Sequence, residues 1–221
     1  MIVFTSRVKS PYEGPNLELF LINADGSGIR RLTYSPKLQE VDAAWSPDGK
    51  AIAFAGYPQQ PFGGSSYTKV YVMNADGTQP HKLVDGAGQP AWSPDGRELA
   101  YSKLEWPGGI RIRAVDGTST RRLPDGRNPA WSPDGRKIAY VDGPLWVRLS
   151  DGSGKARLIS KWGYPGGPTW SSDGKQIVFA SEPGSGNGWE LYVVDTYGNN
   201  RIRLTDNTAY DGAPAWRPAT R

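Results

Sequence analysis

The sequence predicts an all-β fold, a five-bladed β-propeller built from four-stranded antiparallel blades. The first observation is a motif, Trp-Ser-Pro-Asp-Gly followed by Lys or Arg, that recurs along the chain. Successive motif tryptophans are separated by 47, 39, 39 and 46 residues, and a period of about 40 residues carrying several short strands is typical of propeller blades. The second observation is that short apolar runs alternate with Gly-rich turns around each copy. The copies occupy residues 45–50, 92–97, 131–136 and 170–175, where Ser172 replaces the proline, and a shortened copy begins at Trp216.

Each motif is predicted to form a strand, a tight turn and a second strand. Asp-Gly between two alternating runs indicates a hairpin, because glycine accepts a positive φ without steric cost. The preceding proline has a fixed φ and cannot donate a backbone hydrogen bond to a sheet, so it ends the strand. The tryptophan then recurs at one structural position, which suits a large apolar ring packed between neighbouring blades. We therefore expect structural roles for Trp45, Trp92, Trp131, Trp170 and Trp216.

The predicted strands assemble in chain order into one domain, residues 1–221. Residues 2–6 match the second strand of a blade, whereas residues 213–216 match a first strand with no second strand after it. We expect these two ends to pair and close the ring, because an open ring leaves two blade faces unable to bury their apolar side chains. The predicted blades are residues 1–34 with 211–217, 41–84, 88–123, 127–159 and 166–205.

Length and composition favour a single β domain over several other classes. All-β chains of 221 residues are routinely one domain, and the 28 Gly and 19 Pro are distributed as turns. The absence of cysteine excludes disulfide and thiol chemistry. The net charge of +4 is mild and scattered, so no nucleic-acid partner is expected. No apolar run approaches the roughly 20 residues of a membrane span, and the first residues do not have the pattern of a signal peptide.

Two repeated segments resemble the repeats of TolB-type β-propellers. They are Trp-Ser-Pro-Asp-Gly-Lys followed by Ala-Ile-Ala-Phe at residues 45–54, and Val-Met-Asn-Ala-Asp-Gly-Thr at residues 72–78. Similar repeats occur in the propeller domains of prolyl-oligopeptidase-like enzymes, and the resemblance covers essentially the whole chain. It implies a propeller fold; TolB itself is a periplasmic component of the Tol–Pal envelope system, with an N-terminal α/β domain and six blades. This chain is predicted to have five blades, and it carries no Gly-x-Ser-x-Gly nucleophile elbow in a strand-to-helix context.

The predicted binding residues are aromatic side chains in the loops of variable length. These loops connect second to third strands and one blade to the next. Variable loops on a rigid scaffold commonly carry recognition, and aromatic residues are frequent interface anchors. The alternative is that the rings pack over loop prolines. The candidate ligand- or partner-binding residues are Tyr57, Phe62, Tyr67, Trp106, Trp162, Tyr164 and Tyr210.

The propeller channel is a second candidate site. Three residues before each motif tryptophan stand Asp42, Gln89, Asn128, Gly167 and Ala213. The repeat symmetry is expected to bring them to one level near the axis, so that Asp42, Gln89 and Asn128 line the channel. Calcium is bound by carboxylate, amide and carbonyl oxygens, so a calcium ion held through Asp42, or a polar ligand, is one prediction for this channel. A water-filled pore is the other.

We therefore expect a non-catalytic binding scaffold that recognises a protein, a peptide or a small polar ligand on the variable-loop face or at the channel mouth. No cofactor is required by this function, and a monomer is expected. The alternative is a channel-site enzyme of glycosidase or lactonase type with an axial metal ion. Glycosidases need paired carboxylates, and Asp42, Glu40 and Asp211 are the acids that could approach the channel. His81, the sole histidine, begins an outer strand, so no catalytic or zinc-binding role is expected for it.

Overall fold

A computed structural model describes residues 1–9, 16–58, 68–105, 108–123, 126–160, 166–182, 188–207, 211, 212, 214 and 216. These residues form nineteen β-strands and no helix. Accordingly, they include no helix of the length and hydrophobicity that crossing a membrane requires.

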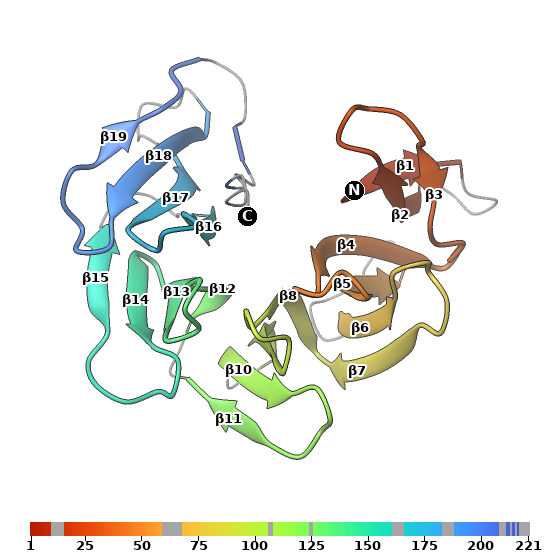
Figure 1. Ribbon diagram of the computed structural model, residues 1–221, viewed down its shortest axis with the longest axis horizontal. Helices are drawn as coiled ribbons and strands as arrows, with labels where there is room; N and C mark the ends of the chain where they lie inside the picture. Colours follow the sequence, from red (N-terminus) through yellow and green to blue (C-terminus); the bar gives the residue numbers. More distant parts are fainter. Residues whose placement is uncertain are drawn as a thin grey trace. The chain divides into compact units, whose positions relative to one another are not determined.

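The strands form five antiparallel sheets, which are the blades of a β-propeller, and this confirms the predicted fold (Figure 1). Blade 1 contains β1 (Ile2–Val8), β2 (Asn16–Ile22) and β3 (Arg30–Arg31). Blade 2 contains β4 (Leu38–Trp45), β5 (Ala51–Pro58), β6 (Lys69–Asn74) and β7 (His81–Asp85). Blade 3 contains β8 (Ala87–Trp92), β9 (Glu98–Lys103), β10 (Gly109–Ala114) and β11 (Thr120–Arg122). Blade 4 contains β12 (Arg127–Trp131), β13 (Lys137–Val141), β14 (Leu145–Leu149) and β15 (Arg157–Ser160). Blade 5 contains β16 (Gly166–Trp170), β17 (Gln176–Ser181), β18 (Glu190–Asp195) and β19 (Ile202–Arg203).

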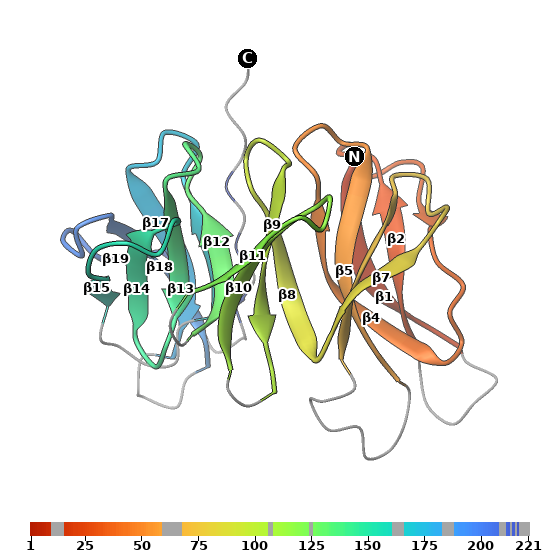
Figure 2. The same ribbon diagram turned by 90° about the horizontal axis from the view of Figure 1, so that it is seen from below.

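The chain divides into two compact units, which are described separately below. Unit 1 comprises residues 1–92 and 101–108, and unit 2 comprises residues 93–100 and 109–221. Within each sheet the strands follow one another in sequence order and lie side by side, as the edge-on view shows (Figure 2).

The apolar cores lie between successive blades of one unit. In unit 1, Leu19 and Leu21 of blade 1 pack in one cluster with Ile52 and Phe54 of blade 2. In unit 2, one cluster joins blade 3 to blade 4 and another joins blade 4 to blade 5. The last strand of a blade, or the residue that follows it, contributes a residue to the core shared with the next blade. The residues in this position are Leu32, Leu123 and Ile159.

The motif turns form as the sequence predicts, with the aspartate organising each one. In the first copy, Asp48 Oδ1 accepts hydrogen bonds from Ser46 Oγ at 2.7 Å and from the backbone N–H of Lys50 at 3.1 Å. Gly49 has a φ of 69°, a conformation that glycine adopts without a Cβ clash. The turn between the third and fourth strands lies against it, because the Ala75 N–H donates to the Lys50 carbonyl at 2.9 Å. This turn-to-turn hydrogen bond recurs in blades 3, 4 and 5.

Blade 1 has three strands among the described residues, β1, β2 and β3. Its fourth strand is predicted from residues 213–216, of which Ala213 and Ala215 lie outside the described residues. Pro214 and Trp216 are described, but neither is assigned to a strand. The pairing of the two chain ends therefore stays a prediction.

Candidate functional site

Tyr57 lies near the end of β5, where it is half-buried and opposite Gln39 of β4. It is the one predicted partner-binding aromatic residue within the described part of the chain. The other six lie outside the described residues, and their binding role stays a prediction: Phe62, Tyr67, Trp106, Trp162, Tyr164 and Tyr210.

The predicted channel positions lie at a β-bulge that recurs in the first strand of blades. In β4, residues 42 and 43 oppose the single residue 54 of β5, because Val41 pairs with Ala55 and Ala44 pairs with Ala53. The register of β12 and β16 shifts at the same place. A bulge redirects the side chain of the extra residue, and a left-handed backbone is uncommon for residues other than glycine. The φ values are 54° for Asp42, 55° for Gln89, 52° for Asn128 and 54° for Gly167.

Asp42 and Gln89 both belong to unit 1 and interact. Asp42 is an exposed residue, yet the protein around its carboxylate removes part of its hydration, and this desolvation raises its pKa. A hydrogen bond from the backbone N–H of Gln89 acts in the opposite direction and lowers the pKa. The side-chain oxygen of Gln89 accepts a hydrogen bond from Ser102 Oγ at 2.7 Å. Asp42 is thus a carboxylate with a raised pKa beside a strained backbone.

These two residues fit a calcium ion poorly. Calcium takes about six to eight oxygen ligands, whereas Asp42 supplies one carboxylate and the Gln89 oxygen already accepts from Ser102. In the described part of the chain, no group of three or more His, Cys, Asp or Glu side chains is placed to hold a metal ion. Asn128 belongs to unit 2 and is described separately from them.

The motif tryptophans connect neighbouring blades through their indole N–H groups. Trp92 Nε1 donates to the Ala44 carbonyl of blade 2 at 3.1 Å, and Trp170 Nε1 donates to the Ala130 carbonyl of blade 4 at 3.0 Å. In both pairs the acceptor directly precedes the tryptophan of the preceding blade. Trp45 packs against the cluster shared by blades 1 and 2, but its buried Nε1 has no hydrogen-bond partner among the described residues. Trp216 is 37% exposed.

Two buried glutamates form a feature that the sequence reasoning missed. Glu18 and Glu190 have no solvent-accessible side-chain surface, and each forms an ion pair with an arginine thirteen residues later. Arg31 Nε lies 2.5 Å from Glu18 Oε2, and Arg203 Nη2 lies 3.0 Å from Glu190 Oε1. The recurring pattern of Glu, then Arg-x-Thr after the same interval, was the available sequence signal.

The threonine of this pattern differs in its partner between the two copies. Thr205 Oγ1 donates to Glu190 at 2.6 Å, and this hydrogen bond is the main reason that the pKa of Glu190 is lowered. Thr33 Oγ1 instead donates to Glu40, whose pKa is raised chiefly by burial. Asp211, the counterpart of Glu40 in the repeat, accepts a hydrogen bond from Asn207 Nδ2 at 2.8 Å. Glu40 and Asp211, two of the three acids considered for the channel enzyme, therefore accept hydrogen bonds from neighbouring side chains.

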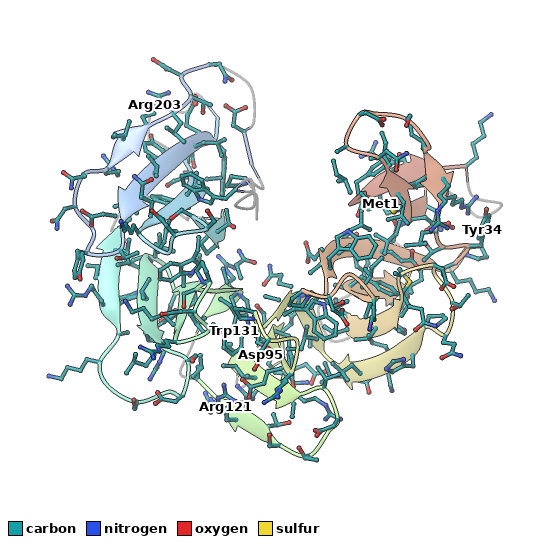
Figure 3. All side chains as sticks on the ribbon, viewed as in Figure 1. Met1, Tyr34, Asp95, Arg121, Trp131 and Arg203 are labelled. Atoms are coloured by element: carbon teal, nitrogen blue, oxygen red, sulfur yellow. The ribbon has the colours of Figure 1, made fainter. Side chains whose placement is uncertain are left out.

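The turn face of unit 2 carries a hollow of about 350 Å³, which we call the Trp131 hollow. It lies between the motif turns of blades 3 and 4. These turns lie close together, since a Cβ added at Gly135 would lie 3.7 Å from Pro94 Cδ. Figure 3 labels Trp131 and Asp95, which lie close together, with Arg121 of β11 nearby. The lining residues are Ser93, Pro94, Asp95, Glu98, Trp131, Pro133, Asp134 and Gly135.

The blades and turns define the class of protein: the chain is a five-bladed β-propeller, and its fold is similar to that of TolB structures. TolB from Acinetobacter baumannii superposes with a TM-score of 0.74 at 19% identity, covering 92% of this chain and 52% of TolB. A gluconolactonase from Xanthomonas campestris has a TM-score of 0.62 at 21% identity, covering 80% of this chain and 65% of that enzyme. An oligogalacturonate lyase from Vibrio parahaemolyticus has a TM-score of 0.57 at 11% identity, covering 86% and 58%.

This chain thus spans little more than half the length of the TolB structure, and these likenesses concern the fold. No protein-family model matches the sequence, and no curated protein matches it.

Proposed function

We propose that the chain is a non-catalytic binding scaffold that recognises a protein or peptide segment. The observation that carries this proposal is the Trp131 hollow, an open recess walled by a tryptophan and two prolines on a rigid array of turns. Aromatic residues on well-ordered surfaces are frequent anchors of protein interfaces, and rigid turns cost little conformational entropy when a partner binds. The likeness to TolB is in keeping with such a role.

Selection from a library of displayed linear peptides tests this function. The full-length protein serves as the bait, and the enriched peptides are synthesised and titrated by calorimetry. We expect saturable binding with one peptide per chain. Enrichment of no sequence, or heats that never saturate, would contradict a peptide-binding scaffold.

A second candidate function is a channel-site hydrolase of lactonase or glycosidase type, and one observation favours it. Asp42 has a raised pKa and lies at a left-handed bulge, and strained residues with perturbed pKa values are often found at functional sites. The likeness to a gluconolactonase points in the same direction. The lactonase form of this function would require a metal ion to polarise the lactone carbonyl, and Asp42 with Gln89 fits a calcium ion poorly.

Lactone and glycoside hydrolysis, measured with and without added calcium, tests the second candidate. Turnover that Asp42→Asn abolishes would establish it in place of the scaffold. Calcium binding by calorimetry in the wild type and in the Asn variant shows whether a metal ion is involved. Equal, negligible heats in both proteins would argue against a calcium site at Asp42.

A further inference from the structure

The Trp131 hollow combines an aromatic wall with ionised carboxylates. Trp131 is half-buried, so part of its ring is accessible, and Pro94 and Pro133 complete the apolar wall. Asp95 and Asp134 come from the motif turns of blades 3 and 4 and line the same space. Ligand cavities measure about 300–1,000 Å³, and this hollow, at about 350 Å³, lies at the small end of that range and has room for one long side chain.

Each of the two aspartates has one carboxylate oxygen available. Asp95 Oδ1 accepts from Ser93 Oγ at 2.6 Å and from the Arg97 N–H at 3.0 Å, and Asp134 Oδ1 makes the equivalent bonds at 2.6 Å and 3.0 Å. The second oxygen, Oδ2, accepts no hydrogen bond from the described residues in either case. The serine hydroxyls are the main cause that lowers the pKa of both aspartates, so both are ionised at neutral pH.

The other charges around the hollow are accounted for. Glu98 accepts from two nitrogens of Arg121, Nη1 and Nη2, and the Nη2 contact is 2.8 Å. Arg121 Nε also donates to the Ser150 carbonyl of blade 4 at 3.1 Å. This ion pair is therefore neutral and fixed. Arg97 and Arg136 are exposed cations of the two turns, and each attracts the aspartate of its own turn. Lys137, at the start of β13, also attracts Asp134.

The space between the motif turns of blades 4 and 5, also in unit 2, does not offer the same surroundings. There the position of Glu98 is occupied by Lys137, and the position of Pro133 by Ser172. Trp170, which corresponds to Trp131, is 6% exposed. Asp173 keeps the same turn hydrogen bonds, from Ser171 Oγ at 2.6 Å and from the Lys175 N–H at 3.0 Å. Asp173 therefore serves as a matched control, with the same turn chemistry outside the hollow.

We propose that the Trp131 hollow binds the side chain of an arginine presented by an extended peptide segment of a protein partner. This inference rests on the scaffold function proposed above. A guanidinium is planar, donates hydrogen bonds in a fixed fork to carboxylate oxygens and stacks on aromatic faces. The free Oδ2 atoms of Asp95 and Asp134 and the ring of Trp131 supply both kinds of contact. The charge of the arginine also complements the ionised carboxylates of Asp95 and Asp134, whose Oδ2 atoms accept no hydrogen bond from the described residues.

An adjoining hollow accommodates the residues next to the arginine. It measures about 630 Å³ and shares Asp95 and Glu98 with the Trp131 hollow. Its walls include Ala114 and Val115, and Val115 is 39% exposed. An extended segment that places its arginine beside Trp131 can therefore lay a small apolar residue against Val115.

The test uses the peptides enriched in the selection described above. We expect arginine to be enriched at one position of the peptides, followed or preceded by a small apolar residue. In one such peptide, citrulline replaces the arginine, because it keeps the shape and removes the charge. Calorimetry then measures the arginine, citrulline and lysine peptides against the wild type, Asp95→Asn/Asp134→Asn and the control Asp48→Asn/Asp173→Asn.

The double Asn variant should lose at least tenfold in affinity for the arginine peptide, and the control pair should stay within twofold of the wild type. Asparagine retains an oxygen that accepts the turn hydrogen bonds, so both variants are expected to fold, and equal melting temperatures verify this. The citrulline peptide should bind the wild type and the double variant with equal, weak affinity. Arginine-free peptides, or a citrulline peptide that binds like the parent, would overturn the inference and leave the scaffold function intact.

Two further outcomes are decisive. A lysine peptide that binds as tightly as the arginine peptide would overturn the guanidinium assignment, because a point charge would then suffice. If no peptide is enriched at all, the scaffold function fails, and the arginine site fails with it.

Discussion

Replacing Trp170 by phenylalanine tests whether the motif tryptophans connect the blades. Trp170 is 6% exposed, packs in the cluster shared by blades 4 and 5, and donates its indole N–H to the Ala130 carbonyl at 3.0 Å. Phenylalanine keeps an aromatic ring in the cluster but removes the donor and part of the volume. Loss of the hydrogen bond should cost about 1 kcal/mol, and the smaller ring roughly 1–2 kcal/mol more, because full truncation of buried aromatic residues costs about 3–5 kcal/mol.

The measurement is urea unfolding followed by far-ultraviolet circular dichroism, which reports on all the blades. A loss of about 2–3 kcal/mol corresponds to a melting temperature lower by roughly 4–12 °C for a chain of this size. The m-value should stay constant, because a changed m-value would indicate that the blades no longer unfold together.

Trp146→Phe is the matched control, since Trp146 is half-buried and its N–H makes a longer, 3.3 Å contact with the Asp142 carbonyl of its own blade. It should cost less than about 1 kcal/mol, in the range of exposed substitutions. Equal losses for the two variants, or a Trp170→Phe protein as stable as the wild type, would refute the view that the inter-blade hydrogen bond and packing set the stability.

Three other perturbations have defined outcomes. Burial raises the pKa of Glu40 above its ordinary value of 4.5, so the ionisation of Glu40 opposes folding, and this cost is absent at low pH and grows as the pH rises through the raised pKa. Glu40→Gln should therefore stabilise the protein more at pH 7 than at pH 4. An equal effect in urea titrations at both pH values would contradict this. Gly167→Ala should cost about 1 kcal/mol because the φ of Gly167 is 54°, whereas a Cβ at Gly88 would meet neighbours at an ordinary 3.5 Å, so Gly88→Ala should be milder by thermal melting. Deletion of residues 211–221 should broaden and lower the melting transition if the two ends pair as predicted, and an unchanged melt would exclude that pairing.

The blades were predictable because the signals that define them are local in sequence. The Asp-Gly turn, the proline before it and the alternating run after it each act within a few residues. Their effect in the structure is equally local: Asp48 binds Ser46 and the N–H of Lys50. Repetition of these local signals at a constant interval then fixes the number and order of the blades.

The bulges were not predictable, because they depend on the register between two strands. The sequence identifies Asp42 and Gln89 as equivalent positions, and symmetry was the reason for grouping them. Asp42 has a left-handed backbone where two residues of β4 face one residue of β5, and Gln89 has a similar φ. Asp42, Asn128 and Gly167 are of types that tolerate a positive φ, but Gln89 is not, so residue type alone did not locate the bulge.

The buried glutamates and the Trp131 hollow depend on contacts between segments that are distant in the sequence. Glu18 contacts Arg31 across neighbouring strands. Arg121 and Arg203 likewise pair with glutamates. The hollow arises because one junction carries Glu98 and Pro133 where the next carries other residues, a difference that a consensus motif conceals.

The unpartnered N–H of Trp45 adds a physical argument to the prediction made from the chain ends. A buried donor without an acceptor costs about 1–3 kcal/mol, and buried polar groups in native proteins are nearly always paired. For Trp92 and Trp170 the acceptor is the carbonyl directly before the preceding motif tryptophan. If the chain ends pair as predicted from the sequence, the same rule would give Trp45 the carbonyl of residue 215, directly before Trp216. That residue lies outside the described part of the chain, so the pairing stays a prediction. The substitution Trp45→Phe distinguishes a paired N–H from an unpaired one. If the N–H is paired in solution, Trp45→Phe should cost as much as Trp170→Phe; if it is unpaired, removing it should relieve a penalty and the substitution should be close to neutral.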